Sequence, residues 1–401
     1  MRNDVNQTMM STKKLNKRLI LNCIRSHPLI YRSTISKKLN LSKPTVSALV
    51  DELIEEGWIN ELDKTEDHLK VGRKPIQLSF NEKAGFVVGV DIGGSGVEIA
   101  LSDLNGTIYD QRVIDTQASL QVGLLHVIHD TVHLILKDAR ISAGEVLGMG
   151  IGVPGIVNVE EGIVIDAPSL DWINYPLKKE AETLFDWKVL IDNDVNVSVL
   201  GEQWLGRARN KSNVILLSIG TGIGCGILLN GNLYRGCKWG AGEVGYMITD
   251  KERAFNAYTK PFKGYGFLDS QLGGPALVEK MKFKLKQHPE HPFYGHEVIT
   301  AKDIFTYAKK DDALALEVID EFISDLSAAI INITSLLNPE IILLGGGISK
   351  SGDWFISKLK AKVKEYVPFE VNIEIAELDE RIGVLGAITL FLKENESVIK
   401  I

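Results

Sequence analysis

Apolar residues recur at three- and four-residue spacing through residues 42–57, and this pattern predicts an amphipathic helix. Ser42 is a good N-cap, Pro44 lies where a missing backbone N–H costs least, and Gly57 is a typical helix stop. The side chains expected in its buried stripe are Val46, Leu49, Val50, Leu53 and Ile54. The outer face of the first turn would carry Ser42, Lys43, Thr45 and Ser47.

Two further helical patterns precede this one. Residues 15–26 predict a helix that ends at His27-Pro28, and its apolar positions are Leu19, Ile20, Cys23 and Ile24. A second helix is expected from Ser33, as its N-cap, through Leu39. The Asn40-Leu41 turn then leads directly into the helix at Ser42, and three helices with so tight a final corner are typical of a helix-turn-helix motif.

Alternating apolar and polar residues follow this motif. Residues 58–62 and 75–80 predict two strands, and the polar segment 63–74 between them would form the tip of a winged hairpin. The tip ends in Gly72-Arg73-Lys74-Pro75, a basic segment able to enter a minor groove. Taken alone, the Ser42 helix is better explained as an ordinary capped amphipathic helix. With its neighbours it indicates a winged helix-turn-helix DNA-binding domain over residues 1–80.

Small hydroxyls and a lysine at a helix N-terminus suit a DNA groove, where they can contact phosphates and base edges. The residues expected to contact DNA are Ser33, Ser42, Lys43, Thr45, Ser47, Arg73 and Lys74. Charge supports this interpretation, because residues 1–80 hold 14 Lys and Arg against 9 Asp and Glu, while the remaining residues hold 31 against 43. A basic head on an acidic body favours contact with nucleic acid through the head only.

Length and composition bound the rest of the chain. Its 401 residues exceed one typical core, so a small head and a body of two lobes are expected. A composition of 45% hydrophobic and 24% charged residues is ordinary for a globular protein. No apolar run reaches membrane-spanning length and no signal region is expected, so we predict no membrane partner and a cytoplasmic location. The three cysteines, Cys23, Cys225 and Cys237, show no paired spacing.

The body contains an internal repeat. Residues 86–101 predict two apolar strands joined by a glycine-rich turn, and the Asn105-Gly106 turn follows. The same order returns in residues 214–229, followed by Asn230-Gly231. Two related lobes facing one another across a cleft are therefore expected. Glycines let backbone N–H groups approach a phosphate, and an acid such as Asp91 could hold Mg²⁺ through water.

The chain at this point resembles the ROK family of repressors, open reading frames and sugar kinases. The similar stretches are Asp91-Ile92-Gly93-Gly94-Ser95, Gly152-Val153-Pro154-Gly155, Asn193-Asp194, Gly220-Thr221-Gly222-Ile223-Gly224, residues 240–245 and residues 337–349. The resemblance implies an actin-like, hexokinase-type α/β fold whose last helix packs back on the first lobe. The first lobe would comprise residues 84–199 plus 383–398, and the second lobe residues 200–382. The winged head is similar to the repressor branch, which includes the xylose repressors.

The resemblance also implies a sugar site. Asn193 and Asp194 match a sugar-binding amide and the carboxylate that acts as general base, so Asp194 would be catalytic if kinase activity survives. Glu243 matches a sugar-contacting glutamate, and Tyr246 stands where the kinases have a histidine. The remaining residues expected near the sugar are Gly94, Ser169, which replaces an asparagine, and Asp269. A vestigial phosphate or nucleotide site would consist of Asp91, Gly93, Ser95, Gly220, Thr221, Gly222 and Gly346.

The family commonly carries a cysteine-rich zinc loop that ends in a sugar-binding glutamate. This chain has no cysteine after Cys237, and residues 264–269 resemble a relic of that loop, with Phe267 in place of a cysteine and Asp269 in place of the glutamate. We therefore expect no structural zinc and assign no residue as a metal ligand. Gly96 stands where many kinases have a basic residue, and the sequence leaves open whether ATP and Mg²⁺ bind.

A two-lobed sugar sensor joined to a DNA-binding head predicts a homodimeric transcriptional repressor of carbohydrate-utilisation genes. Its partners would be double-stranded operator DNA and a small aldose such as xylose or glucose, with no cofactor required. Sugar would shift the lobe equilibrium and so change the spacing of two recognition helices. The alternatives are an ATP-dependent sugar kinase that carries a DNA-binding head, and a DNA-binding protein that a partner protein regulates.

Overall fold

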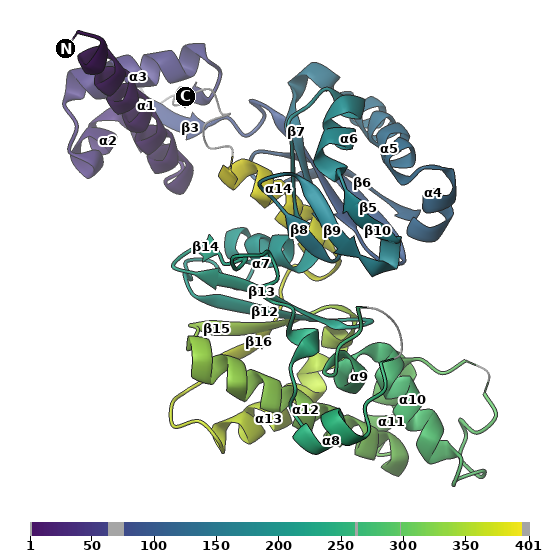
Figure 1. The fold of residues 1–401 in the computed structure, drawn as a ribbon. Helices are drawn as coiled ribbons and strands as arrows, with labels where there is room; N and C mark the ends of the chain where they lie inside the picture. The colour runs from purple at the N-terminus through teal and green to yellow at the C-terminus, as the bar shows by residue number, and fades with distance from the viewer. Residues whose placement is uncertain (1, 63–75, 261–263, 297, 395–401) are drawn as a thin grey trace.

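The computed structural model describes residues 2–62, 76–260, 264–296 and 298–394, arranged as an N-terminal head and a two-lobed body (Figure 1). The head consists of three helices and a three-stranded sheet of order β1-β3-β2, the winged helix-turn-helix arrangement expected. Its elements are α1 (Arg2–Ser26), β1 (Ile30–Tyr31), α2 (Arg32–Leu39), α3 (Lys43–Glu55), β2 (Ile59–Leu62) and β3 (Gln77–Phe80).

Helix α3 begins and ends as its sequence predicts. The Ser42 hydroxyl accepts a hydrogen bond from the backbone N–H of Thr45 at 3.2 Å, and Pro44 lies in the first turn. The helix stops at Gly57, whose φ of +80° suits glycine. Four of the five residues predicted in the apolar stripe are buried, and Ile54 is partly buried against the same core.

Three details of the head differ from the sequence prediction. Ser33 is not the N-cap of α2, because the chain passes from β1 directly into the helix and Tyr31 takes that position without a side-chain cap. Strand β1 exists through its pairing with β3, where Ile30 lies opposite Leu78, and two residues show no periodicity of their own. Helix α1 begins at Arg2, and Leu19 on it is 40% exposed. The predicted wing tip, with Arg73 and Lys74, lies outside the described residues.

The first lobe is built on a five-stranded sheet of order β11-β7-β4-β5-β6. Its strands are β4 (Phe86–Ile92), β5 (Gly96–Asp103), β6 (Ile108–Asp115), β7 (Val146–Val153) and β11 (Val189–Asn193). A smaller sheet comprises β8 (Ile156–Asn158), β9 (Ile163–Ala167) and β10 (Trp172–Tyr175). The helical segments are α4 (Thr116–Val122), α5 (Leu124–Ala139), η1 (Ala143–Glu145), η2 (Pro168–Leu170) and α6 (Leu177–Phe185).

The second lobe repeats this topology. Its sheet has the order β14-β13-β12-β15-β16, so each sheet consists of an antiparallel hairpin extended on one side by parallel strands. The strands are β12 (Val214–Ile219), β13 (Ile223–Leu229), β14 (Asn232–Leu233), β15 (Ile341–Gly345) and β16 (Ile373–Ile375). The repeat predicted from the two glycine-rich turns is therefore confirmed in the strand order.

Helices of the second lobe surround its largest core. They are η3 (Val244–Tyr246), α8 (Lys251–Asn256), α9 (Asp269–Leu272), α10 (Gly274–Leu285), α11 (Ala301–Ala308), α12 (Ala313–Leu337), η4 (Gly347–Ser351) and α13 (Gly352–Lys364). Phe305, Phe322 and Phe355 are fully buried where α11, α12 and α13 meet. Among the described residues no single helix has the length and apolarity to cross a membrane, although the bent pair α4 and α5 meets both criteria jointly.

Helices α7 (Asp194–Trp204) and α14 (Ile382–Glu394), the latter preceded by η5 (Asp379–Arg381), pack against each other (Figure 1). Helix α14 lies directly on strands β4 and β7, and glycines make this close approach possible. A Cβ at Gly150 would lie 1.9 Å from the carbonyl oxygen of Ala387, and one at Gly386 would lie 2.0 Å from that of Val197. Helix α7 also contacts β12 and β13, so it joins the two lobes.

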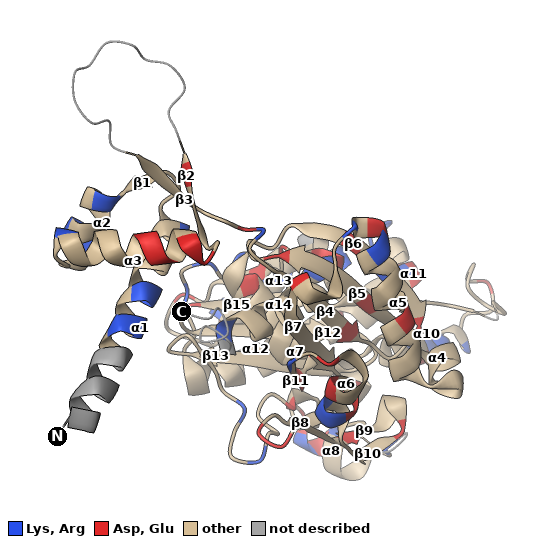
Figure 2. Ribbon diagram, turned by 90° about the horizontal axis from the view of Figure 1, so that it is seen from above, with Lys and Arg blue, Asp and Glu red and all other residues tan. Residues whose placement is uncertain are grey.

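Charge is distributed unevenly over the molecule. Lysine and arginine colour α1 and α2 of the head in Figure 2, whereas acidic residues colour part of α3 and many positions on the body. Within the head, the basic residues thus lie mainly on α1 and α2 and the acidic residues on part of α3.

Candidate functional site

The polar end of the first-lobe sheet is formed where β11 passes into α7. Asn193 is the N-cap of α7, and its side-chain oxygen accepts hydrogen bonds from the N–H groups of Val195 at 2.9 Å and Asn196 at 3.1 Å. Its amide nitrogen donates to the Gly155 carbonyl at 3.0 Å. Both ends of the Asn193 amide are therefore fixed. Asp194 follows at the start of the helix, and burial raises its pKa to about 6 although hydrogen bonds to its carboxylate oppose the shift.

A buried ion pair between the lobes supports this turn. The Asp192 side chain is 1% exposed, and its carboxylate accepts from Arg235 Nε at 2.8 Å and Nη2 at 2.7 Å. Its other oxygen accepts from the backbone N–H of Asn193 at 2.8 Å and from the Asn196 side chain at 2.9 Å. Arg235 follows β14 of the second lobe, so the pair joins the two lobes beside Asn193. Sequence reasoning missed Arg235, because its partner lies on the other lobe.

Glu243 and Tyr246 extend the site into the second lobe. Glu243 is an exposed residue, yet desolvation by the surrounding protein, followed by the negative charges of Asp194 and Asp269, raises its pKa to about 7. Tyr246 is 48% exposed, and its pKa is raised first by desolvation and then by the charge of Glu243. Lys260 Nζ lies 5.7 Å from the centre of the Tyr246 ring. Asp194 and Asp269 thus lie near enough to Glu243 to raise its pKa, and Glu243 in turn raises that of Tyr246.

Gly94 and Ser169 are also brought together. A Cβ at Gly94 would lie 3.9 Å from the Ser169 Cβ, and the Gln117 side chain donates to the carbonyl of Gly94 at 3.3 Å and to that of Ser169 at 3.5 Å. The second lobe contacts the residue before Ser169 through Gly264, where a Cβ would lie 2.7 Å from Pro168. Gly94 and Ser169 thus stand near the contact between the lobes.

Asp269 is placed differently from the other predicted site residues. It is 6% exposed, and its two oxygens accept from the backbone N–H groups of Ile223 at 2.8 Å and Gly266 at 2.7 Å. Gly222 and Gly245 pack so closely that an added Cβ would lie 2.7 Å and 2.4 Å from this carboxylate. Asp269 therefore braces three segments of the second lobe, and its contact with a sugar stays a prediction.

Each lobe contributes one glycine turn. In the first lobe the N–H of Gly93 donates to the Gly96 carbonyl at 2.9 Å, and Ser95 is exposed beside it. In the second lobe the N–H of Gly220 donates to the Gly222 carbonyl at 2.9 Å, and Thr221 is exposed at the tip. Gly346, with a φ of +80°, packs against this turn, since a Cβ there would lie 2.5 Å from the Ile219 carbonyl oxygen. The residues predicted for a phosphate site therefore form two clusters.

The environment of Asp91 fits a cation better than it fits a phosphate. One oxygen of Asp91 is buried and has no hydrogen-bond partner among the described residues, and burial, followed by the charge of Asp194, raises its pKa well above the usual value. Such an oxygen suits a hard divalent cation. Glu98 lies opposite Asp91 on the neighbouring strand β5. The positive charge of Lys350 is already paired with the carboxylate of Glu380, at 2.6 Å. A phosphate here would therefore meet carboxylates.

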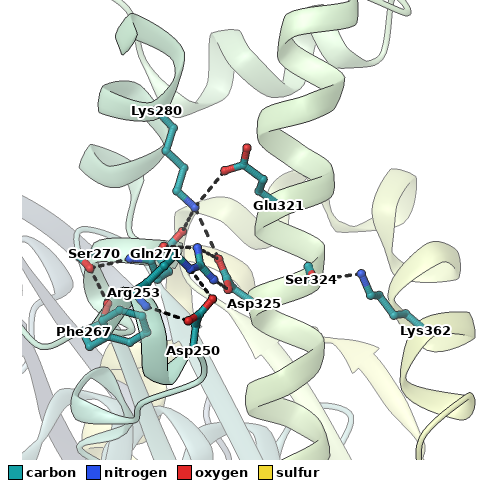
Figure 3. A network of polar contacts seen from close by, with 10 residues as sticks. All are labelled: Asp250, Arg253, Phe267, Ser270, Gln271, Lys280, Glu321, Ser324, Asp325 and Lys362. Atoms are coloured by element: carbon teal, nitrogen blue, oxygen red, sulfur yellow. Dashed lines mark hydrogen bonds and ion pairs between the residues drawn. The ribbon is translucent and has the colours of Figure 1, made fainter. Parts of the chain in front are cut away.

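A network of ion pairs and hydrogen bonds joins α8, α9 and α10 to α12 (Figure 3). The Arg253 guanidinium donates to Asp250 at 2.8 Å, to the Gln271 side chain at 2.8 Å and to Asp325 at 2.5 Å. Lys280 adds a contact to Asp325 at 3.5 Å. Phe267, which replaces the expected cysteine, is 4% exposed and packs on Tyr258. The described residues contain no cluster of three or more side chains suited to hold a metal ion.

The predicted DNA-contacting residues of the head gather at the starts of α2 and α3. Ser33, Ser42 and Lys43 are exposed, while Thr45 and Ser47 are half-buried. Arg32, which sequence reasoning did not single out, ties these helices to the sheet through ion pairs with Asp51 and Glu61, both at 2.7 Å.

Comparison with protein families divides the chain at the same place as the structure. Residues 87–394 match the ROK family, and residues 15–69 match the MarR family. The chain is 32% identical to a xylose repressor from Caldicellulosiruptor bescii over 97% of this chain and 98% of that protein. It is also 32% identical to a glucokinase from Halalkalibacterium halodurans, over 78% of this chain and 97% of that protein.

Solved structures give the same division. A ROK family transcriptional regulator, a homologue of the E. coli MLC protein, matches with a TM-score of 0.81 at 24% identity and covers 97% of this chain and 98% of that chain. At this identity the likeness concerns the fold. A ROK family glucokinase from Streptomyces griseus, solved with glucose and AMPPNP, matches with a TM-score of 0.63 at 26% identity and covers 76% of this chain and 99% of that chain.

Proposed function

This chain belongs to the ROK family, and we propose that it is a sugar-responsive, DNA-binding transcriptional repressor of carbohydrate-utilisation genes. The observation that carries the proposal is the union of a winged helix-turn-helix head with a sugar-kinase-like body in one chain. Relatives described as xylose repressors share this union over nearly their whole length, whereas the glucokinase relatives align with the body only.

The effector in this proposal is a small aldose such as xylose. Asn193 has one side-chain N–H left to donate, and Asp194 and Glu243 offer two carboxylates to the hydroxyls of a sugar, which both donate and accept hydrogen bonds. The fixed Asn193 amide and the ion pair between Asp192 and Arg235 reduce the entropy lost on binding, because these groups are already ordered. Gly94, Ser169, Tyr246 and Asp269 complete the proposed pocket.

DNA binding would use a homodimer in the cytoplasm. Ser33, Ser42, Lys43, Thr45 and Ser47 would present hydroxyls and a cation to DNA, and the sequence adds Arg73 and Lys74 as further candidate contacts. A dimer positions two α3 helices on half-sites about one helical turn apart, so a change of lobe arrangement that rotates the heads lowers operator affinity. Sugar that prefers one lobe arrangement would thereby release the operator.

The second candidate function is an ATP-dependent sugar kinase that carries a DNA-binding head. Asp194 occupies the position of a general base, and the unpartnered Asp91 oxygen suits a Mg²⁺ ion that would neutralise nucleotide phosphates when bound. Three features favour the repressor without catalysis: Tyr246 replaces the family histidine, Gly96 lacks the basic side chain, and Glu98 lies opposite Asp91.

Fluorescence anisotropy with DNA from upstream of this protein's own gene tests the proposal. The protein is titrated at fixed salt, and the complex is then titrated with a panel of aldoses. Tight, salt-sensitive binding reversed by one sugar supports the repressor. Binding that no sugar changes would favour regulation by a partner protein, and an absence of binding together with sugar-dependent ATP consumption would favour the kinase.

A further inference from the structure

Helix α7 carries proposed sugar ligands at one end and touches the far edge of the first lobe at the other. Asp194 is its first residue and Trp204 its last, so its 11 residues span about 16 Å. The helix packs against α14 and against strands of both sheets along this length. A change in the angle between the lobes therefore must displace α7 relative to at least one sheet.

The C-terminal end of α7 contacts the Asn105-Gly106 turn between β5 and β6. A Cβ at Gly106 would lie 2.6 Å from Leu205 Cδ1 and 3.0 Å from Trp204 Cη2, and the φ of Gly106 is +89°. This end of α7 is firmly held, because the fully buried Glu202 accepts from the backbone N–H groups of Glu377 and Leu378, both at 2.8 Å. Close-packed contacts of this kind transmit displacement instead of absorbing it.

The same turn is bonded to the DNA-binding head. Arg25, in the last turn of α1, donates from Nη2 to the Leu104 carbonyl at 3.2 Å. Its guanidinium lies 5.0 Å from the centre of the Phe80 ring, and burial lowers its pKa. Leu104 is 1% exposed and belongs to one hydrophobic cluster with Ile20 and Ile24 of α1.

We propose that α7 is the lever that couples the sugar site to the head, and that Arg25 is the residue that transmits its movement. The sugar holds Asn193 and Asp194 in one lobe arrangement, and α7 moves with them. The Trp204 end then shifts the 104–106 turn, and the Leu104–Arg25 hydrogen bond shifts α1 and with it the orientation of α3. This inference rests on the proposed function, since it names how that site controls DNA binding.

Coupling between two ligands is reciprocal and is measured as a ratio of affinities. The operator Kd of full-length protein is measured without and with the saturating aldose found active in the anisotropy assay, for the wild type and for Arg25→Gln. The operator Kd of the wild type should change by about 5- to 150-fold when the sugar is added, the usual range of allosteric coupling. In Arg25→Gln this ratio should fall to about two or less, while the operator Kd without sugar and the sugar Kd without operator stay near wild type.

Two further variants sharpen the test. Trp204→Leu replaces the indole that contacts the 104–106 turn with a smaller side chain. This variant should reduce the ratio of operator Kd values with and without sugar, although Arg25 is unchanged. Lys137→Gln changes an exposed residue of α5 and should leave the ratio unchanged. If a folded Arg25→Gln or Trp204→Leu protein kept the wild-type ratio of operator Kd values with and without sugar, the proposed coupling through α7 would be wrong. Operator binding of the wild type that no sugar alters would instead overturn the proposed function, on which the lever depends.

Discussion

Two carboxyl groups of the proposed sugar site titrate close to neutrality, which is unusual for such side chains. The pKa of Asp194 is raised to about 6 and that of Glu243 to about 7, in both cases chiefly by desolvation. Their ordinary values are 3.8 and 4.5. Between those values and neutrality the folded protein binds more protons than the unfolded chain, so these groups favour the folded state at low pH and lose that contribution as pH rises through 6 and 7.

Sugar affinity should follow the opposite pH trend. Hydroxyls donate more strongly to ionised carboxylates than to protonated ones, so affinity should rise between pH 5.5 and 8 as Glu243 and Asp194 lose their protons. Isothermal titration calorimetry across this range measures the change. Glu243→Gln cannot ionise and should flatten the upper part of the profile; an unchanged profile in that variant would remove Glu243 from the sugar contact.

Lys43 provides the corresponding prediction for DNA. Lys43→Ala should weaken operator binding by a similar factor on specific and unrelated sequences, and should reduce the slope of log K against log salt by about 0.9, as expected for one lost phosphate contact. Anisotropy titrations at several salt concentrations measure both effects. Lys137→Ala, which removes a charge from the body, is the matched control. An unchanged slope in Lys43→Ala would place the α3 N-terminus away from the phosphates.

At the scale of elements, local signals were sufficient for α3 and for the glycine turns. The N-cap Ser42, the first-turn Pro44 and the stop at Gly57 act within one helix, so no partner is needed to predict it. Strand β1 and the pairing of Arg235 with Asp192 depend on segments far away in the chain. Their sequence neighbourhoods carry no pattern, which is why the N-cap of α2 and the ion pair between the lobes could not be predicted.

The packing of α14 on the first-lobe sheet gives a prediction for stability. Gly150→Ala should lower the free energy of unfolding by about 3 kcal/mol or more, because its Cβ would lie 1.9 Å from a backbone carbonyl that cannot move cheaply. Gly144→Ala is the control, since no described residue other than its two chain neighbours has an atom within 4 Å of the added Cβ. Urea denaturation measures both. Equal stability of the two variants would contradict the close approach of α14 to β7.

At the scale of the whole molecule, sugar binding is expected to stabilise the protein. A ligand that binds only the folded state at 100 times its Kd adds about 2.7 kcal/mol, and the melting temperature should rise accordingly. Differential scanning fluorimetry with the aldose panel measures this shift, and Glu243→Ala should lose it while still binding operator. A sugar that alters operator affinity without raising the melting temperature would argue against this pocket.

The helix that covers the first lobe comes from the far end of the described chain. Strand β4 ends at Ile92, yet α14, which lies on it, begins at Ile382. During synthesis the head can fold early, because its helices and strands all lie within residues 2–80, whereas β4 and β7 wait for nearly the whole body to leave the ribosome. A stop codon before Ile382 would therefore yield a chain that keeps the head and both lobes but lacks α14, so that the apolar face of β4 and β7 is uncovered, and such a product is expected to aggregate.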